Sequence, residues 1–451
     1  MLITDRFGSE SSADSTSCVQ AKRNEIDWVA RKSRTILLGA LAVILTTCQL
    51  PAQVANTARH SAPAPSVVGF WAGEDAALPQ GGRKPTGPTT YYDPAYRGDF
   101  TPELWRVLQD YRVPLYLNVR YGRDFGPVSP TVHSDVVALV RKANSLKIPV
   151  IAWVVVPYAQ GYWAYQGNAQ AMFDAVKAWA QWKESNHLQF TSVALDQEFS
   201  WQNLQTFIAD VTSRDPKKLT SWMRSNIDPQ AQCEAFHAYQ QLISWAHIHS
   251  IRVVAAEAPM VADDLADGNL ALQNALQITG SSPGYDEMYL MAYRSAGAQA
   301  GVDPGSAYAA SYYASMQKYF GTIGQVSIGI PGQAPYDKLT TLVNDVRMLV
   351  GLGAKEVPIY SLEEIVAAFG VEGIKTVAQA AQHPMEGSEL SEAIKPKSEA
   401  GGMLDMGKSQ NATATELTVA VTKEQGHPQQ PNSWPDGCGN LSVHALIGPQ
   451  D

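Results

Sequence analysis

The sequence predicts an α/β protein built as a (β/α)8 barrel (TIM barrel), with a disordered N-terminal leader and a disordered C-terminal tail. Three observations predict this fold. Short runs rich in Val, Ile and Leu recur eight times from Val67 onward, which is the composition of buried parallel strands. A helical pattern separates each run from the next. The repeats cover about three hundred residues, in the usual size range of such barrels.

The predicted strands are the eight apolar runs, each short enough for a buried strand. In chain order they are Val67–Trp71, Leu115–Val119, Val150–Val156, Ser192–Asp196, Val253–Ala256, Met288–Ala292, Val326–Ile330 and Val357–Tyr360.

The helical patterns lie after these runs. The first helix is predicted to begin at Thr101, a good N-cap residue, with Pro102 in the first turn where proline is tolerated. The others are predicted at Val132–Ser145, Ala169–Glu184, Ala231–His249, Asn269–Ile278, Ala309–Tyr319, Tyr336–Val350 and Leu362–Phe369.

A doubly wound open sheet is the alternative arrangement of the same elements. Such sheets often carry a glycine-rich phosphate loop after the first strand. Residues 70–74, Phe-Trp-Ala-Gly-Glu, lack that spacing. The pattern therefore favours the closed barrel.

Composition limits the class of partner. The 451 residues carry 34 Lys and Arg against 43 Asp and Glu, a formal charge of −9, which argues against nucleic acid. With 45% hydrophobic residues, the chain can bury a sizeable core. Most of the 11 Trp and 19 Tyr are expected in the core, but an excess of aromatic rings at strand ends would suit stacking on sugars.

The N-terminal region reads as an export signal. The segment Arg-Lys-Ser-Arg at 31–34 precedes an apolar run over residues 36–45, and a stretch rich in small residues and Pro follows. The run is shorter than the ~20 residues of a membrane span. The predicted segments are a leader with signal peptide at 1–55, a linker at 56–66, the barrel at 67–383 and a low-complexity tail at 384–451.

Residues 45–48, Leu-Thr-Thr-Cys, resemble a bacterial lipobox, in which the cysteine is lipidated after cleavage. Thr47 departs from the small residue usual at that place. The alternatives are membrane attachment through a lipid on Cys48 and a plain signal peptide cleaved between Ala52 and Ala55. Both predict an exported protein, extracellular or associated with the cell envelope.

No metal or cofactor is expected. The four cysteines include no pair with metal-ligand spacing. His247 and His249 are two apart in a predicted helix, so they face different directions. The oligomeric state is not predicted.

The fourth strand carries the main catalytic candidates. Asp196 and Glu198 are two residues apart at its end, so both side chains point to one face. A carboxylate anion close to a second carboxyl group favours the protonated form of the latter. Acid catalysis of glycoside hydrolysis uses such an arrangement. We therefore expect one of the two to act as general acid and the other as its electrostatic partner.

Further candidates lie in or just after other strands, where a barrel presents side chains to one mouth. They are Trp71, Trp153, Glu257, Tyr289, Tyr293, Gln333 and Tyr360, as candidates for contact with a substrate. Glu363 lies in the first turn of the last helix, where the helix dipole favours a carboxylate.

The order of short motifs resembles glycoside hydrolase family 18, the chitinase-like barrels. The motifs are Val-Val-Gly-Phe-Trp at 67–71, Leu-Asp-Gln-Glu at 195–198, Met-Ala-Tyr at 291–293, Ile-Gly-Ile-Pro-Gly at 328–332 and Tyr-Ser-Leu-Glu at 360–363. The resemblance implies hydrolysis of a glycan with N-acetylated sugars, in which the substrate's acetamido group is the internal nucleophile. It gives Glu198 the acid role, Asp196 the orienting role and Tyr293 an acetamido contact.

The chain departs from the family's signature in the fourth strand, Asp-x-x-Asp-x-Asp-x-Glu. Thr191 and Ala194 stand where the family has its first two acids, so only Asp196 and Glu198 match. This departure keeps two other readings open. One is a catalytically inactive carbohydrate-binding barrel. The other is a two-carboxylate hydrolase that uses Glu198 and Glu257.

Overall fold

The structure is a computed structural model of the chain. It describes residues 66–73, 100–120, 134–212, 216–267, 270–280, 284–299 and 303–395. The predicted leader with Cys48, nearly all of the linker and most of the tail lie outside these residues.

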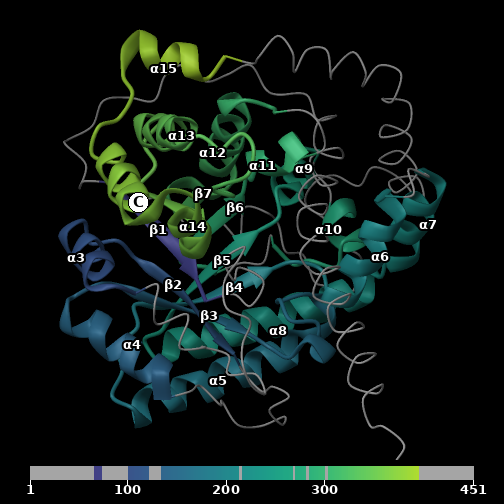
Figure 1. The fold of residues 1–451 in the computed structure, drawn as a ribbon. Coiled ribbons are helices and arrows are strands. Elements are labelled where there is room, and N and C mark those ends of the chain that lie inside the picture. Colours follow the sequence, from purple (N-terminus) through teal and green to yellow (C-terminus); the bar gives the residue numbers. More distant parts are fainter. Residues whose placement is uncertain are drawn as a thin grey trace, which may run out of the picture.

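Eight parallel strands form a closed barrel in the order β1-β2-β3-β4-β5-β6-β7-β8 (Figure 1). Since β1 pairs with both β2 and β8, the open-sheet alternative is excluded and the predicted fold class is confirmed. The strands are β1 Val67–Ala72, β2 Leu115–Arg120, β3 Val150–Val155, β4 Ser192–Gln197, β5 Arg252–Glu257, β6 Glu287–Met291, β7 Gly324–Gly329 and β8 Glu356–Tyr360.

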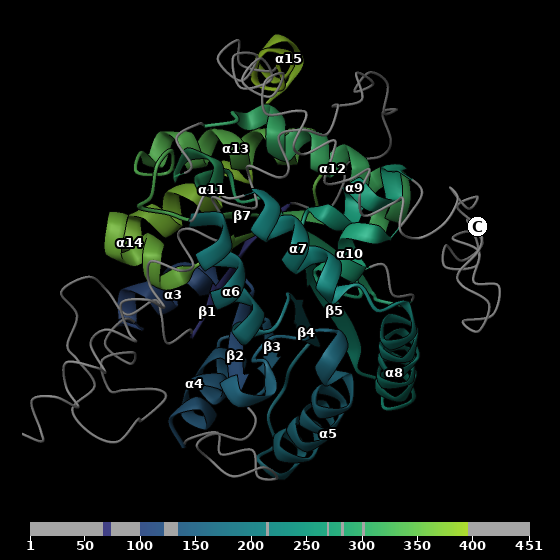
Figure 2. The ribbon, with the colours of Figure 1, turned by 90° about the vertical axis from the view of Figure 1, so that its right-hand side faces the viewer.

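Helices surround the strands, as the view in Figure 2 shows. The α-helices are α3 Pro102–Asp110, α4 Ser134–Ser145, α5 Ala169–Ser185, α6 Trp201–Thr212, α7 Pro216–Asn226, α8 Pro229–Ile248, α9 Met260–Asp267, α10 Ala271–Ala275, α11 Arg294–Gln299, α12 Ser306–Phe320, α13 Leu339–Gly351, α14 Leu362–Ala380 and α15 Gly387–Ala393. Short 3₁₀ turns occur at η2 Tyr158–Gln160, η3 Gln166–Asn168 and η4 Gly321–Ile323.

The connections contain more helix than the sequence pattern predicts. Between β4 and β5 the chain forms α6, α7 and α8 instead of one helix, and α7 and α8 each begin with a proline in the first turn. The helix predicted from Tyr336 begins only at Leu339. Tyr336 lies in the connection before it and donates a hydrogen bond from its hydroxyl to Asp345 at 2.7 Å.

The C-terminal part of the barrel domain extends past the boundary predicted at residue 383. Met385 is buried, and its N–H donates to the Arg347 carbonyl at 3.0 Å. In α15, the Glu389 carboxylate accepts two hydrogen bonds from the Arg347 guanidinium, at 2.7 and 2.9 Å. The described chain therefore adds α15 to the surface of α13 (Figure 1).

Aromatic side chains fill the interior of the barrel. The Trp71 ring stacks on Tyr116 at a centroid distance of 4.5 Å and meets Trp153 edge-on at 5.3 Å. Gly69 allows this packing, because a Cβ there would lie 2.9 Å from the Tyr116 ring. The interior is thus a packed core and not a pore, as in other barrels of this fold.

Below this aromatic layer, polar groups line the end of the barrel where the strands begin. The Tyr116 hydroxyl donates to Glu356 at 2.8 Å, and the Tyr289 hydroxyl donates to Glu287 at 3.0 Å. Arg252 binds Glu287 at 2.8 Å. Burial, opposed by the Tyr116 hydrogen bond, raises the pKa of Glu356 to about 8.

Glu356→Gln is expected to remove a pH-dependent loss of stability. The folded-state pKa of about 8 exceeds the ordinary value of 4.5, so the protein binds this proton more tightly when folded. The stabilisation is complete below about pH 4.5 and is lost as the pH rises through 8, at up to about 1.4 kcal/mol per unit. The side chain of the variant is neutral at every pH. The free energy of unfolding of the variant, measured relative to the wild type, should therefore be higher at pH 8.5 than at pH 4.5.

Urea denaturation at these two pH values measures the difference. Glu184→Gln, at an exposed position in α5, is the control and should show no pH-dependent difference from the wild type. An equal stability difference between Glu356→Gln and the wild type at both pH values would contradict the prediction.

Candidate active site

The end of β4 presents two carboxyl groups to the mouth of the barrel. Asp196 is the fifth residue of β4 and Glu198 follows the strand directly. Their spacing of two places both side chains on one face. Asp196 is 5% exposed, whereas Glu198 is half-buried and reaches solvent. One carboxyl group is therefore shielded, and the other is accessible to a ligand.

The face that Asp196 shares is the interior one. In the ladder between β4 and β5, Asp196 pairs with Ala256, and between β5 and β6 Ala256 pairs with Tyr289. Tyr289 meets the Tyr116 ring inside the barrel, edge-on at 6.0 Å. Because paired residues of neighbouring parallel strands point to the same side, Asp196 faces the barrel axis.

Two tyrosines lie at the same end of the barrel. Tyr293, two residues past β6, stacks against Tyr360, the last residue of β8, at a centroid distance of 5.9 Å. Gly329 permits this approach, since a Cβ there would lie 3.4 Å from the Tyr293 ring and 2.8 Å from the Tyr360 carbonyl oxygen. Gln333 follows in the connection after β7 and is half-buried.

Trp71 and Trp153 lie in the interior of the barrel and not at an exposed rim. Both are almost fully buried and pack against each other inside the barrel. Glu363, in the first turn of α14, accepts a hydrogen bond from the Gly73 N–H at 2.7 Å. It thereby ties the end of β1 to the last strand–helix unit of the barrel.

Glu257 and Tyr289 are not brought to the mouth. Tyr289 lies in the buried interior, with its hydroxyl bound to Glu287. Glu257 pairs with Gln197, so it lies on the outer face of the sheet, opposite to Asp196. It is 0% exposed, and Gly280 in the β5–β6 connection approaches so closely that a Cβ there would clash with its carboxyl group.

The environment of Glu257 favours its neutral form. Burial, and then the charge of Asp196, raise its pKa well above the usual value. Within the described part of the chain, neither of its carboxyl oxygens has a hydrogen-bond partner. The adjacent Gln197 bridges two side chains of the β5–β6 connection, donating to Tyr285 at 2.9 Å and accepting from Thr279 at 3.1 Å.

An ion-pair network that the sequence analysis did not identify begins directly after Tyr293. Arg294 is buried and donates to Asp345 in α13 at 2.9 Å and to Asp303 at 2.7 Å. Burial opposes its charge, but Asp303 and Asp345 more than compensate and raise its pKa. The network joins α11, the start of α12 and α13 around the residue next to Tyr293. The charge pattern alone gave no signal for it, because its members are up to 51 residues apart.

The connection from β3 to α5 is the second feature that the sequence analysis missed. The β3–β4 ladder ends at Trp153 and Ala194, and beyond it Ala164 pairs with Gln197. Tyr162 and Trp163 from this connection are buried. The Tyr162 hydroxyl accepts from Asn118 of β2 at 3.4 Å. Two glycines and several aromatics directly after a strand were the available signal.

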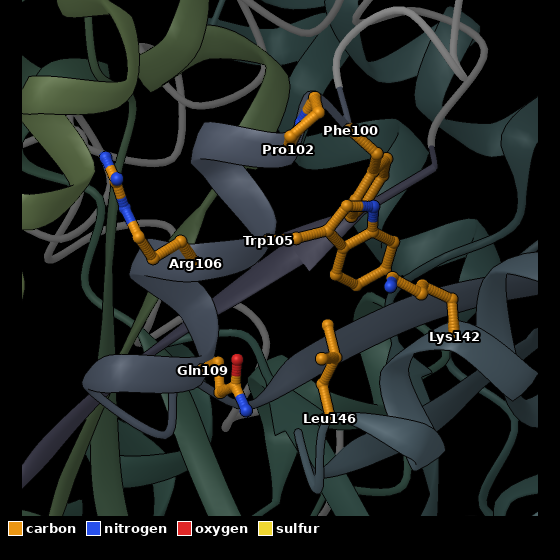
Figure 3. Close-up of a pocket in the computed structure, with 7 residues that line it drawn as sticks. All are labelled: Phe100, Pro102, Trp105, Arg106, Gln109, Lys142 and Leu146. Atoms are coloured by element: carbon orange, nitrogen blue, oxygen red, sulfur yellow. The ribbon is translucent and has the colours of Figure 1, made fainter.

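A separate pocket lies on the outside of the barrel, between α3 and α4 (Figure 3). Its volume is about 260 Å³, and its central side chain is Trp105, which packs on Phe100 at a centroid distance of 4.8 Å. Arg106, Gln109 and Lys142 contribute polar groups. None of the residues predicted as catalytic lines this pocket.

No cluster of three or more His, Cys, Asp or Glu side chains in the described ranges is arranged to hold a metal ion. None of the helices within those ranges is long and apolar enough to cross a membrane.

Fold and site together define a closed (β/α)8 barrel with an accessible and a shielded carboxyl group at the carboxyl end of one strand. No protein-family model matches the chain, and no curated protein matches it either.

Solved structures similar to the chain include three bacterial enzymes. The glycoside hydrolase domain of PgaB (BpsB) from Bordetella bronchiseptica is 13% identical, with a TM-score of 0.39, over 65% of this chain and 94% of that one. A chitinase from Chromobacterium violaceum is 11% identical, with a TM-score of 0.39, over 69% and 98%. A broad-specificity GH5-4 endoglucanase from an uncultured bacterium is 12% identical, with a TM-score of 0.43, over 70% and 94%.

Proposed function

We propose that the protein is an exported glycoside hydrolase that cleaves a glycan containing N-acetylated sugars. The observation that carries the proposal is the end of β4, where Glu198 reaches solvent beside the buried Asp196. A hydrolase of this kind needs a proton donor at the glycosidic oxygen and a negative charge near the sugar ring. These two side chains offer both on one face of the strand.

The proposed reaction is substrate-assisted. Glu198 donates its proton to the glycosidic oxygen as the bond from that oxygen to the sugar C1 breaks. The acetamido carbonyl oxygen of the same sugar forms a bond to C1, and Asp196 stabilises the positive charge that develops. Water then adds to C1 and releases the acetamido group, while the Glu198 carboxylate accepts a proton from that water. Tyr293 contacts the acetamido group, beside Tyr360.

The position of Glu257 argues for this scheme over the two-carboxylate one. Retaining and inverting pairs place both carboxyl groups next to the scissile bond. Glu257 lies on the outer face of the sheet, against Gly280, whereas Asp196 faces the interior and Glu198, two residues further on, is expected to share that side. The proposal therefore gives Glu257 no contact with the sugar.

A panel of glycans and aryl glycosides tests the proposal with the purified protein. We expect cleavage of aryl glycosides of N-acetylated sugars and at least ~100-fold less of the matched glycosides that carry a hydroxyl instead of the acetamido group, because only the former supply the nucleophile. Equal cleavage of both would contradict substrate assistance. Binding of a glycan without any cleavage would favour the second candidate, a catalytically inactive sugar-binding barrel. The observation that favours this candidate is the absence of the signature acids at Thr191 and Ala194.

Export is part of the proposal. Its support is the basic flank and apolar run ahead of Cys48. Cell fractionation tests it, since recovery of the unprocessed chain in the cytoplasm would contradict it, and radiolabelled palmitate would distinguish lipidation at Cys48 from a plain signal peptide.

A further inference from the structure

A short segment between β3 and α5 crosses the end of the strand that carries the acids. We call residues 160–168 the strap. Up to Ala194, β4 pairs with β3 through Trp153. Past that point the strap replaces β3 as the neighbour of β4, and Ala164 pairs with Gln197.

One strap residue binds the main chain of both acids. The Ala164 N–H donates to the carbonyl oxygen of Asp196 at 2.9 Å, and the Ala164 carbonyl accepts from the N–H of Glu198 at 3.1 Å. On the other side, the register with β5 runs through Gln197. The backbone position of Glu198, beyond the last strand residue, therefore depends on the strap.

The strap itself is held in shape by the side chain of Asn168, which is 6% exposed. Its amide nitrogen donates to the carbonyl oxygens of Gln160 at 2.9 Å and Trp163 at 2.7 Å. Its oxygen accepts from the Tyr165 N–H at 2.9 Å. These three bonds close the strap on both sides of Ala164.

The body of the barrel fixes the strap from outside. The hydroxyl of Tyr239, in α8, donates to the Tyr165 carbonyl at 3.0 Å. Gly161 and Gly167 enclose the Tyr165 ring so tightly that a Cβ at either position would clash with it. Gly161 also has φ +100°, a conformation that side chains other than glycine rarely adopt.

From these contacts we infer that Asn168 is a positioning residue, which sets the strap and, through Ala164, the main-chain position of Asp196 and Glu198. The role in catalysis rests on the proposed function, while the mechanical role does not. A general acid must lie within hydrogen-bond reach of the oxygen it protonates. A misplacement of about 1 Å can cost ~100-fold in rate, so a bond network that fixes this backbone matters for kcat.

Asn168→Asp is the first test. It keeps the shape and the acceptor but loses the two N–H donors to Gln160 and Trp163. We expect kcat for glycosides with poor leaving groups to fall ~10–100-fold, with KM little changed. Activated dinitrophenyl glycosides, which need little protonation to depart, should lose much less. A variant that is merely less stable would lose activity on both substrates alike.

Tyr239→Phe is a milder variant that removes the hydrogen bonds from the Tyr239 hydroxyl to the Tyr165 carbonyl, at 3.0 Å, and to the Asn168 amide oxygen, at 3.4 Å. It should show the same leaving-group dependence at smaller size. Asn144→Asp is the matched control. Asn144 also binds backbone through both ends of its amide, donating to and accepting from Gln189 at 2.9 Å, but it does so ahead of β4, at the opposite end from the acids. It should leave the leaving-group dependence unchanged.

Amide hydrogen exchange gives a readout that needs no activity. In the Asn168→Asp and Tyr239→Phe variants the Glu198 amide should exchange at least ~10-fold faster than in the wild type. The Leu195 amide within β4 should exchange as in the wild type, because only the Glu198 amide is bound by Ala164. If the wild type cleaves no glycan, the proposed function fails, and the exchange result alone tests whether Asn168 positions the strap. Wild-type exchange at Glu198 in both variants, or equal loss on good and poor leaving groups, overturns the inference.

Discussion

Glu198→Gln is expected to lower kcat on a glycan substrate by ~10²–10⁴-fold, the usual contribution of a positioned general acid. Gln has the shape of Glu but carries no proton that it can give to the glycosidic oxygen. The side chain is half-buried at the end of β4 and not in the packed core, so the fold should stay intact. KM should change little, because the lost interaction belongs to the transition state.

Steady-state kinetics and thermal unfolding of the same samples measure this. Glu184→Gln, exposed near the end of α5, repeats the chemical change away from the mouth and should leave kcat unchanged. Loss of less than tenfold in the Glu198 variant, on a substrate with a poor leaving group, would remove Glu198 from the acid role.

Two companion variants separate the mechanisms. Asp196→Asn should lower activity and move the upper limb of the pH profile to lower pH, because a nearby anion raises the pKa of a carboxylic acid. Glu257→Gln should be nearly silent in kinetics, since burial raises the pKa of Glu257 and favours its neutral form, and since the side chain lies on the outer face of the sheet. An essential Glu257 with a nearly silent Asp196 would replace the substrate-assisted scheme by the two-glutamate one.

Asp345→Ala is expected to cost about 3–5 kcal/mol of unfolding free energy, the usual result of removing one partner of a buried ion pair. Asp345 is fully buried and accepts hydrogen bonds from Arg294, Ser306 and Tyr336. The substitution leaves the Arg294 guanidinium in the interior with less counter-charge. Thermal unfolding should shift down on the order of 10 °C.

The exposed pair between Arg347 and Glu389 provides the control. It has the same two-bond geometry, at 2.7 and 2.9 Å, but its carboxylate is half-exposed. Solvated pairs contribute only about 0–1 kcal/mol, so Glu389→Ala should change stability by no more than this. If the two variants lose equal stability, burial does not explain the contribution of the Arg294 network to the free energy of unfolding.

The strands could be predicted because buried strands have a characteristic local composition. Runs such as residues 150–155 are apolar throughout, since helices cover one side of each strand and the packed interior the other. The helices between β4 and β5 were less predictable. Their existence depends on the length of the connection and on packing, and the only local marks are the prolines at 216 and 229.

The site was predictable only within one strand. The spacing of Asp196 and Glu198 fixes that they share a face, and it does so without knowledge of any neighbour. Which face a residue on another strand shares depends on the register between strands. Glu257 pairs with Gln197 and not with Asp196, so it points outward, although it closes β5 as Asp196 nearly closes β4. A shift by one residue reverses the side, and sequence does not reveal it.

Contacts between distant segments could not be predicted from the sequence for the same reason. Asn168 binds strap carbonyls that are only a few residues away in the chain. The hydrogen bond that connects the strap to Glu198, however, is made by Ala164, and it forms only because β3 and β4 cease to pair after Trp153 and Ala194. The Arg294 network likewise joins side chains that meet only after α13 has packed.

Closure of the barrel between β1 and β8 also has a consequence for biosynthesis. Gly73 and Glu363, which bind each other at that seam, are 290 residues apart in the chain. At a usual elongation rate of about 5–20 residues per second, the ribosome needs roughly 15–60 s to make the second partner after the first. Until then the nascent sheet has two open edges, which are templates for pairing with other chains. Delivery of β8 removes both edges at once, in the same step that places Tyr360 beside Tyr293.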